Sequence, residues 1–159
     1  LAGTFARSGQ RTALLNLDFR ELGSDDHEFY DGVTVASLLA GGPDNTSDEA
    51  WQNYLDRVDF GTHLEGLDYL PAGAAECSPL AILMHPRLRL LINALRRRYV
   101  FLVLDVPPVL EYPDAVHVGC LADVAVLSTI RNFSKSGQVN EARRRLNAIG
   151  LPVVGTLIA

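Results

Sequence analysis

The sequence has 159 residues, of which 48% are hydrophobic and 21% charged, a composition typical of one soluble globular domain with a substantial core. Its formal net charge of −5 argues against a general nucleic-acid binder, and no apolar run approaches the roughly 20 residues that span a bilayer. Cys77 and Cys120 are too few and too far apart for a disulfide framework, so reduced thiols in the cytosol are the simpler interpretation. The chain begins at Leu1 rather than Met, so we expect the natural polypeptide to continue upstream.

The first half of the sequence predicts a helix over 1–8 closed by Gly9, a buried strand over 12–18 ending in Asp18, and a polar loop over 21–31. Two short helices, 34–40 and 48–55, and a weak strand, 64–70, follow. Thr34 is the expected N-cap of the first short helix, which Gly41 and Gly42 end.

The second half alternates helices with apolar strands. The clearest helix begins at Pro86 and places four apolar residues on one face, namely Leu88, Leu91, Ile92 and Leu95. A later helix is amphipathic, with Val139, Ala142, Leu146 and Ile149 expected to face inward. In chain order the predicted elements are helix 86–98, strand 100–105, helix 116–121, strand 124–128, helix 136–149 and strand 151–159.

The stretch around Asp105 is the centre of the predicted fold. Five apolar residues run into Asp105, and Pro107 and Pro108 then end the strand because proline has no N–H to donate. Such an unbroken run is typical of a central strand buried on both faces of a parallel sheet, whose carboxyl end is where ligands bind. Asp105 is then either a Walker B aspartate, which holds nucleotide-bound magnesium, or a solvated residue at a strand end.

Asp18 also ends a predicted strand, so we expect Asp18 and Asp105 at the same edge of the sheet. Strands that alternate with helices indicate βαβ units. The predicted fold class is therefore α/β, a doubly wound, mostly parallel sheet with helices on both faces.

Four motifs in order along the chain resemble those of bacterial tyrosine autokinases, which belong to the MinD/ParA-type P-loop ATPases. Residues 14–20 (Leu-Leu-Asn-Leu-Asp-Phe-Arg) resemble the Walker A-prime motif, and residues 67–73 resemble the Leu-Pro-Ala-Gly strand and turn. Residues 104–109, followed by Asp114-Ala115, resemble the Walker B segment, and residues 150–155 resemble a late strand of the family.

The resemblance implies a P-loop NTPase-like kinase domain that uses ATP and Mg²⁺ and phosphorylates tyrosines to control synthesis and export of capsular and extracellular polysaccharide. It implies that Asp105 holds magnesium through water, that Asp18 acts on the metal or the attacking group, and that Arg20 organises the site, with Asn16 also beside the cofactor. It further implies a cytoplasmic location at the inner face of the membrane, a transmembrane chain-length-determinant partner and possible self-association.

Three departures from the family pattern follow from the sequence. The 159 residues contain no Gly-x-x-x-x-Gly-Lys-Ser/Thr, so we expect a single kinase-like domain, residues 1–159, that lacks the first strand and the P-loop. No tyrosine-rich tail precedes Ala159, and the tyrosines look structural. Asn16 replaces the first carboxylate of the A-prime pair, and an amide can neither act as a base nor bring negative charge to magnesium. Truncation explains the first two departures but not Asn16.

Asn16 therefore favours a second hypothesis, a non-catalytic regulatory or scaffold relative that binds the membrane partner. A MinD/ParA-type positioning ATPase is a third. Under the kinase hypothesis we predict no useful catalysis by residues 1–159 alone, because the P-loop lysine and hydroxyl are absent.

Other polar residues have competing interpretations. The arginine triplets 96–98 and 143–145 suit a helix end and a solvated helix face, with docking to anionic lipid or a partner as the alternative to the second. Glu111 and Asp114 either touch the nucleotide site or keep a loop soluble. Cys77 and Cys120 are interpreted as packing residues, and the four histidines lack metal-ligand spacing.

Overall fold

The structure is a computed structural model that describes residues 1–20, 32–44, 47–60, 65–74 and 77–158. It divides into two compact units, Leu1–Asp105 and Val106–Ala159. The predicted loop 21–31 lies outside the described residues. The first unit contains α1 (Ala2–Arg7), β1 (Thr12–Asn16), α2 (Val35–Gly41), α3 (Asp48–Leu55), β2 (Leu67–Leu70), α4 (Pro79–Leu83), α5 (Pro86–Arg96) and β3 (Phe101–Asp105). The second contains α6 (Asp114–Gly119), β4 (Ala125–Thr129), α7 (Ser136–Ala148) and β5 (Val153–Ile158).

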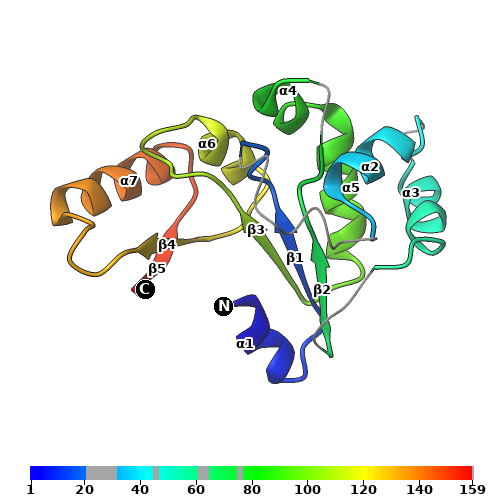
Figure 1. Cartoon of the computed structure of the whole chain (residues 1–159), viewed down its shortest axis with the longest axis horizontal. Helices are drawn as coiled ribbons and strands as arrows, with labels where there is room; N and C mark the ends of the chain where they lie inside the picture. The colour runs from blue at the N-terminus through cyan, green and yellow to red at the C-terminus, as the bar shows by residue number, and fades with distance from the viewer. Residues whose placement is uncertain (21–31, 45–46, 61–64, 75–76, 159) are drawn as a thin grey trace. The chain divides into compact units, whose positions relative to one another are not determined.

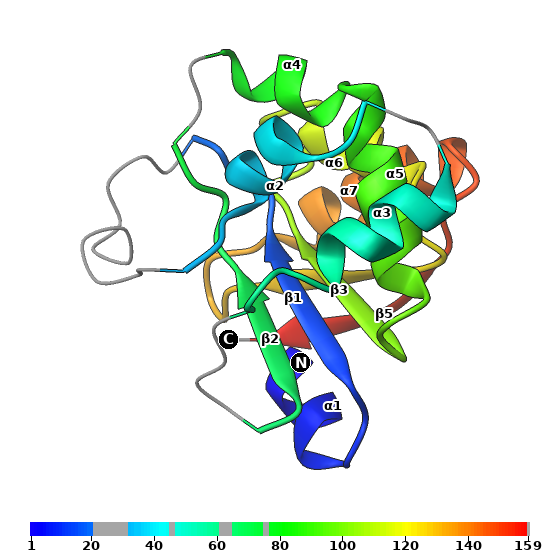
Figure 2. The ribbon, with the colours of Figure 1, turned by 90° about the vertical axis from the view of Figure 1, so that its right-hand side faces the viewer.

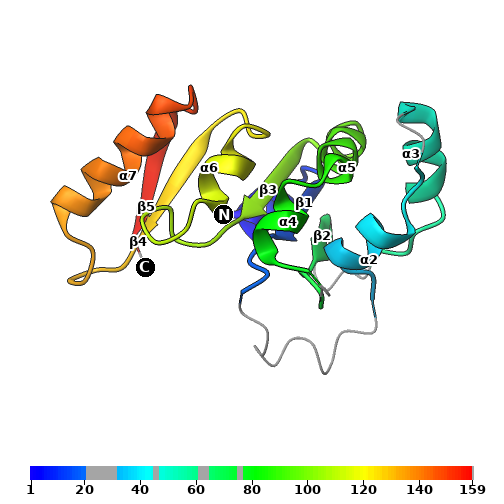
Figure 3. The ribbon, with the colours of Figure 1, turned by 90° about the horizontal axis from the view of Figure 1, so that it is seen from above.

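The sheet of the first unit has the strand order β2-β1-β3, and both pairings are parallel. Figure 2 shows β1 and β2 running the same way, and Figure 3 shows the three strands in this order. Helices α1 and α5 lie on opposite sides of the strands (Figure 1). On one side the Phe5 ring of α1 stacks on Phe101 of β3 at a centroid distance of 3.9 Å. Parallel sheets with helices confirm the predicted α/β class.

Local signals explain where the helices begin and end. Gly9 adopts φ +81° after α1, and the N–H groups of Gly9 and Gln10 donate to the carbonyls of Ala6 and Phe5 at 2.8 and 3.2 Å. This is a Schellman arrangement, in which a left-handed glycine closes the helix, so the predicted closure is confirmed. Ser47 caps α3 by accepting a hydrogen bond from the Ala50 N–H at 3.2 Å, and α3 has the predicted bounds.

Helix α5 confirms the predicted apolar face. Pro86 occupies its first turn and His85 caps it. The four apolar residues predicted to face inward are all at most 1% exposed, namely Leu88, Leu91, Ile92 and Leu95. The preceding helix, α4, was not predicted. Its Ser78-Pro79 start is a helix-start signal, but a helix of five residues presents too little periodicity to detect.

The second unit has a parallel two-stranded sheet, β4-β5, against which α7 packs. Ala142 and Leu146 of α7 are buried as predicted, whereas Val139 and Ile149 are only half-buried. No helix in the described part of the chain is both long and apolar enough to cross a membrane.

The predicted central strand was wrong in one respect. β3 forms as expected, but among the described residues it pairs only with β1, and residues 101–104 are half-buried rather than buried. The central strand of this sheet is β1, in which Ala13 and Leu15 are 0% exposed. An apolar run indicates that a strand packs against a core, but the number of strands that pair with it depends on the tertiary fold.

Candidate functional site

The carboxyl ends of β1 and β3 meet at one edge of the sheet, as predicted. Asn16 and Asp105 are register partners on these adjacent parallel strands. Beyond them, the Leu17 N–H donates to the Asp105 carbonyl at 2.8 Å, which continues the pairing for one more residue. The structure thus brings Asn16 and Asp105 side by side, with the Asp105 residue exposed.

Asp18 lies two residues beyond the strand end rather than on it, in a turn built by side chains. The Asn16 Oδ1 accepts a hydrogen bond from the Asp18 N–H at 2.8 Å, and the Asp18 Oδ1 accepts one from the Arg20 N–H at 2.9 Å. Both contacts are Asx turns, in which the side chain replaces a backbone acceptor. Between them, Leu17 and Phe19 are 0% and 3% exposed and anchor the turn in the core.

This turn assigns Asn16 a role that the sequence did not reveal. An aspartate could accept the same hydrogen bond, so the turn requires an oxygen at position 16 and not a charge. The Asn16 amide keeps the turn while removing one negative charge from the edge. The side chains of Asn16 and Asp18 are half-buried, and Arg20 is exposed.

The donor set limits how magnesium would bind. Within the described residues, no group of three or more His, Cys, Asp or Glu side chains could hold a metal ion. Magnesium keeps several waters and is usually bound through one or two carboxylates together with substrate phosphates. The described residues therefore offer no dedicated metal cage, and the water-mediated binding of magnesium by Asp105 and Asp18 stays a prediction.

The Leu-Pro-Ala-Gly turn after β2 supports the N-terminus of α2. The carbonyls of Pro71 and Ala72 accept hydrogen bonds from the N–H groups of Val35 and Ala36 at 2.8 and 2.9 Å. Gly73 has φ +81°, and a Cβ atom on it would lie 2.2 Å from the Thr34 Oγ1. The motif therefore needs glycine for both its backbone conformation and its close approach to the capped end of α2.

Several other predicted residues are placed differently from expectation. Cys77 and Cys120 are both exposed, so their interpretation as packing residues was wrong; Cys77 precedes the N-cap of α4, and Cys120 is the C-cap of α6. Asp114 is 0% exposed in the first turn of α6, so loop solubility does not explain it, whereas Glu111 is exposed. His85 caps α5 through its Nδ1, which accepts from the Arg87 N–H at 3.2 Å.

The described tyrosines include two with clear structural roles. The Tyr99 hydroxyl donates to the Asp68 Oδ2 at 2.6 Å. Burial and this hydrogen bond both raise the pKa of Tyr99 well above its ordinary value. Tyr54 packs edge-on against Trp51 at a centroid distance of 5.9 Å, and burial raises its pKa as well.

The curated proteins that this chain resembles along nearly its whole length are bacterial tyrosine-protein kinases. The putative tyrosine-protein kinase EpsB of Ralstonia solanacearum is 26% identical over 157 residues, which is 99% of this chain and 20% of that protein. The tyrosine-protein kinase CpsD of Streptococcus pneumoniae is 25% identical over 162 residues, or 99% of this chain and 66% of CpsD. The chain thus spans less than two thirds of the length of these relatives. No family model matches it.

Solved structures agree with these relatives. The BceF tyrosine kinase domain superposes with a TM-score of 0.74 at 28% identity, covering 99% of this chain and 59% of that one. The cell division ATPase MinD of Pyrococcus furiosus shares the fold alone, with a TM-score of 0.61 at 17% identity and coverage of 99% and 62%. The homologues of this chain are bacterial tyrosine-protein kinases, its structural neighbours are such kinase domains and MinD/ParA-type ATPases, and the likeness covers the whole chain.

Proposed function

We propose that this chain is part of an ATP-dependent protein tyrosine kinase-type domain. The observation that carries the proposal is the carboxyl edge of β1 and β3, where Asn16 and Asp105 lie in register and Asp18 follows in a side-chain-built turn. Ligands of open α/β sheets bind at this edge. The tyrosine-protein kinases EpsB and CpsD align with 99% of this chain, which supports the same function.

In this proposal Asp105 orients the water shell of a magnesium ion bound with ATP or ADP, and Asp18 acts on the metal or the attacking hydroxyl. Asn16 holds the turn that carries Asp18, and Arg20 continues that turn through its N–H. Phosphoryl transfer depends mainly on positioning and charge stabilisation. The phosphate cradle and its lysine are not supplied by residues 1–159, so this chain alone is expected to bind nucleotide weakly and to catalyse no useful turnover.

The process, partner and location remain part of the proposal. The family resemblance supports control of capsular or extracellular polysaccharide synthesis and export, at the inner face of the cell membrane. It also supports a transmembrane chain-length-determinant partner and self-association.

Nuclear magnetic resonance titration with Mg·ADP tests the nucleotide site directly. We expect shifts of the backbone amides of residues 16–20 and 105–106, and their loss in Asp105→Asn. The matched control is Asp59→Asn, because Asp59 is an exposed carboxylate in the segment that follows α3. Equal shifts in Asp105→Asn and the parent chain would place the nucleotide elsewhere and refute the proposed site.

A second candidate function is a non-catalytic scaffold that keeps the fold to bind the membrane partner. Asn16 favours it, because the amide preserves the turn without the carboxylate expected of an active site. This alternative predicts no amide shifts with Mg·ADP. It also predicts that Asn16→Asp adds little autophosphorylation in a version of the chain that is supplied with a P-loop. A positioning ATPase of the MinD/ParA type would instead turn over ATP without modifying tyrosine.

A further inference from the structure

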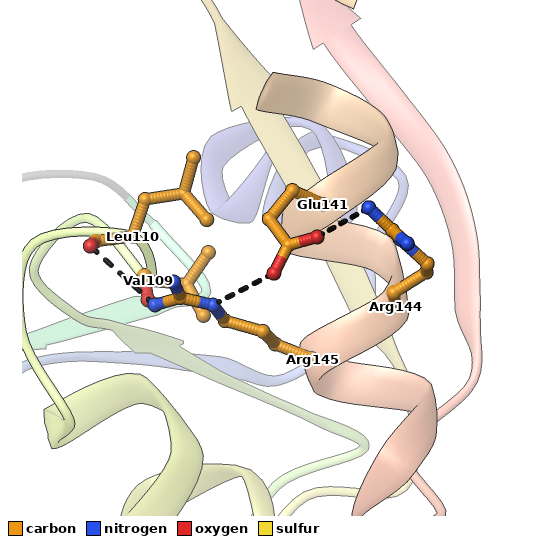
Figure 4. Close-up of polar contacts among 5 residues, drawn as sticks. All are labelled: Val109, Leu110, Glu141, Arg144 and Arg145. Atoms are coloured by element: carbon orange, nitrogen blue, oxygen red, sulfur yellow. Dashed lines mark hydrogen bonds and ion pairs between the residues drawn. The ribbon is translucent and has the colours of Figure 1, made fainter. Parts of the chain in front are cut away.

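The loop that follows Asp105 in the sequence is held by an arginine from α7. The Arg145 Nη1 donates to the carbonyls of Val109 and Leu110 at 3.3 and 3.4 Å (Figure 4). Among the described residues, no backbone N–H group donates to either of these carbonyls. One guanidinium therefore satisfies two successive carbonyls of the same turn, and its planar fork suits such a double contact.

The clamp acts on the peptide units that close the turn. The N–H groups of Glu111 and Tyr112 both donate to the Pro108 carbonyl, at 3.0 and 3.1 Å. The Leu110 carbonyl and the Glu111 N–H belong to one planar peptide unit, so fixing the carbonyl also fixes the direction of the N–H. Arg145 thereby stabilises the turn hydrogen bonds as well as its own.

A carboxylate orients Arg145. Glu141, one helical turn earlier, accepts from the Arg145 Nε at 3.3 Å and from the Arg144 Nη2 at 2.5 Å (Figure 4). Glu141 is 39% exposed in its side chain and lies between the two guanidinium groups. Two of the three arginines at 143–145 are thus engaged within the protein, which favours a structural role over lipid docking for Arg145.

We infer that Arg145 is a positioning residue that fixes the loop after Asp105, with Glu141 holding its guanidinium in place. The inference rests on the proposed function for its consequence, because the loop begins at the residue after the proposed magnesium ligand. Loss of the clamp should therefore loosen residues 106–112 and weaken any nucleotide contact that this loop makes.

Amide hydrogen exchange of the whole chain tests the clamp without any activity. In Arg145→Gln we expect the Glu111 and Tyr112 amides to exchange about tenfold faster, the effect of losing one charge-assisted hydrogen bond. Exchange of the α7 amides at Ala142 and Leu146 should not change. Arg145→Lys should recover part of the protection, because one ammonium reaches a carbonyl but lacks the planar fork.

Two further variants decide whether the effect belongs to the clamp. Arg143→Gln is the matched control: it removes the same charge from an exposed position of the same helix and should change exchange by less than about twofold. Glu141→Gln should give an intermediate acceleration. If Arg145→Gln matches Arg143→Gln, or if the whole of α7 loosens with the loop, the inference is wrong.

Titration with Mg·ADP separates this inference from the proposed function. Weaker nucleotide binding in Arg145→Gln, but not in Arg143→Gln, supports both. Faster loop exchange in a chain that shows no nucleotide binding supports the clamp and refutes the nucleotide site. Unchanged loop exchange with intact nucleotide binding refutes the clamp alone.

Discussion

Two substitutions of Asn16 separate two properties of the candidate site. One is the hydrogen-bond acceptor that the turn needs, and the other is the negative charge at the carboxyl ends of β1 and β3. Asn16→Asp keeps an oxygen for the Asp18 N–H and adds a carboxylate in register with Asp105. Asn16→Ala removes the acceptor and adds no charge. The two variants should therefore destabilise the chain for different reasons.

The magnitude follows from the strand spacing. Adjacent strands lie about 4.8 Å apart. At that distance two unit charges repel by about 0.9 kcal/mol in bulk water and by about 3.5 kcal/mol at an effective dielectric constant of about 20. Asp105 is exposed, so water screens the pair and we expect about 1 kcal/mol from Asn16→Asp at low salt. Asn16→Ala should cost a similar amount, about 1 kcal/mol, through the lost hydrogen bond.

Salt distinguishes these equal losses. The screening length falls from about 30 Å at 0.01 M ionic strength to about 3 Å at 1 M. In thermal melts followed by circular dichroism, Asn16→Asp should lower the melting temperature by about 2–4 °C at low salt, for a chain of this size. This difference from the parent chain should shrink at high salt. The lower melting temperature of Asn16→Ala should be the same at low and high salt.

A double-mutant cycle provides the decisive control. In an Asp105→Asn background the repulsion no longer exists, so Asn16→Asp should be nearly neutral, and the coupling free energy should be about 1 kcal/mol. If Asn16→Asp costs the same stability in both backgrounds, or the same at low and high salt, the electrostatic reasoning is refuted. Either result would indicate that position 16 responds to shape alone.

The remaining predictions concern the parts that support the site. Gly73→Ala should destabilise the chain by at least about 2 kcal/mol, because it combines a left-handed backbone with a clash against Thr34; its control, Gly137→Ala in open space on α7, should stabilise slightly in the same melts. The raised pKa of Tyr99 means that the folded chain holds a proton that the unfolded chain releases, so stability should fall as pH rises above about 10. Tyr99→Phe should lower stability by about 1 kcal/mol at neutral pH and make the alkaline decline shallower in pH-dependent unfolding. A steeper decline in that variant would contradict the assignment. ATP turnover by the chain that disappears in Asp105→Asn would contradict the predicted inactivity of residues 1–159.

Local signals in the sequence predicted the elements well, and long-range contacts were harder to infer. Pro86 and the apolar spacing after it were sufficient to place α5, because both act within one or two helical turns. The parallel run of β1 and β3 followed from two strands that end in polar residues. That β3 pairs with β1 alone among the described residues did not follow, because the number of neighbours of a strand is not encoded in its own residues.

The same limit applies to the candidate site. The motif around Asn16 was visible, but its role in the turn was not, since an Asx turn depends on backbone directions that a motif does not specify. The clamp by Arg145 joins residues 35 and 36 positions apart, and nothing in the local pattern pairs them. The burial of Asp114 was equally hidden, because a carboxylate after a proline is typical of both a solvated loop and a helix start.

The contact between the Leu-Pro-Ala-Gly turn and α2 determines where the chain can change length. Two consecutive hydrogen bonds, from Val35 to Pro71 and from Ala36 to Ala72, align these segments residue by residue. One inserted residue between Leu70 and Gly73 would break this alignment and move the obligatory glycine away from Thr34. Insertions and deletions between relatives should therefore be excluded from residues 70–73 and accumulate instead in connections that no such pair of hydrogen bonds aligns.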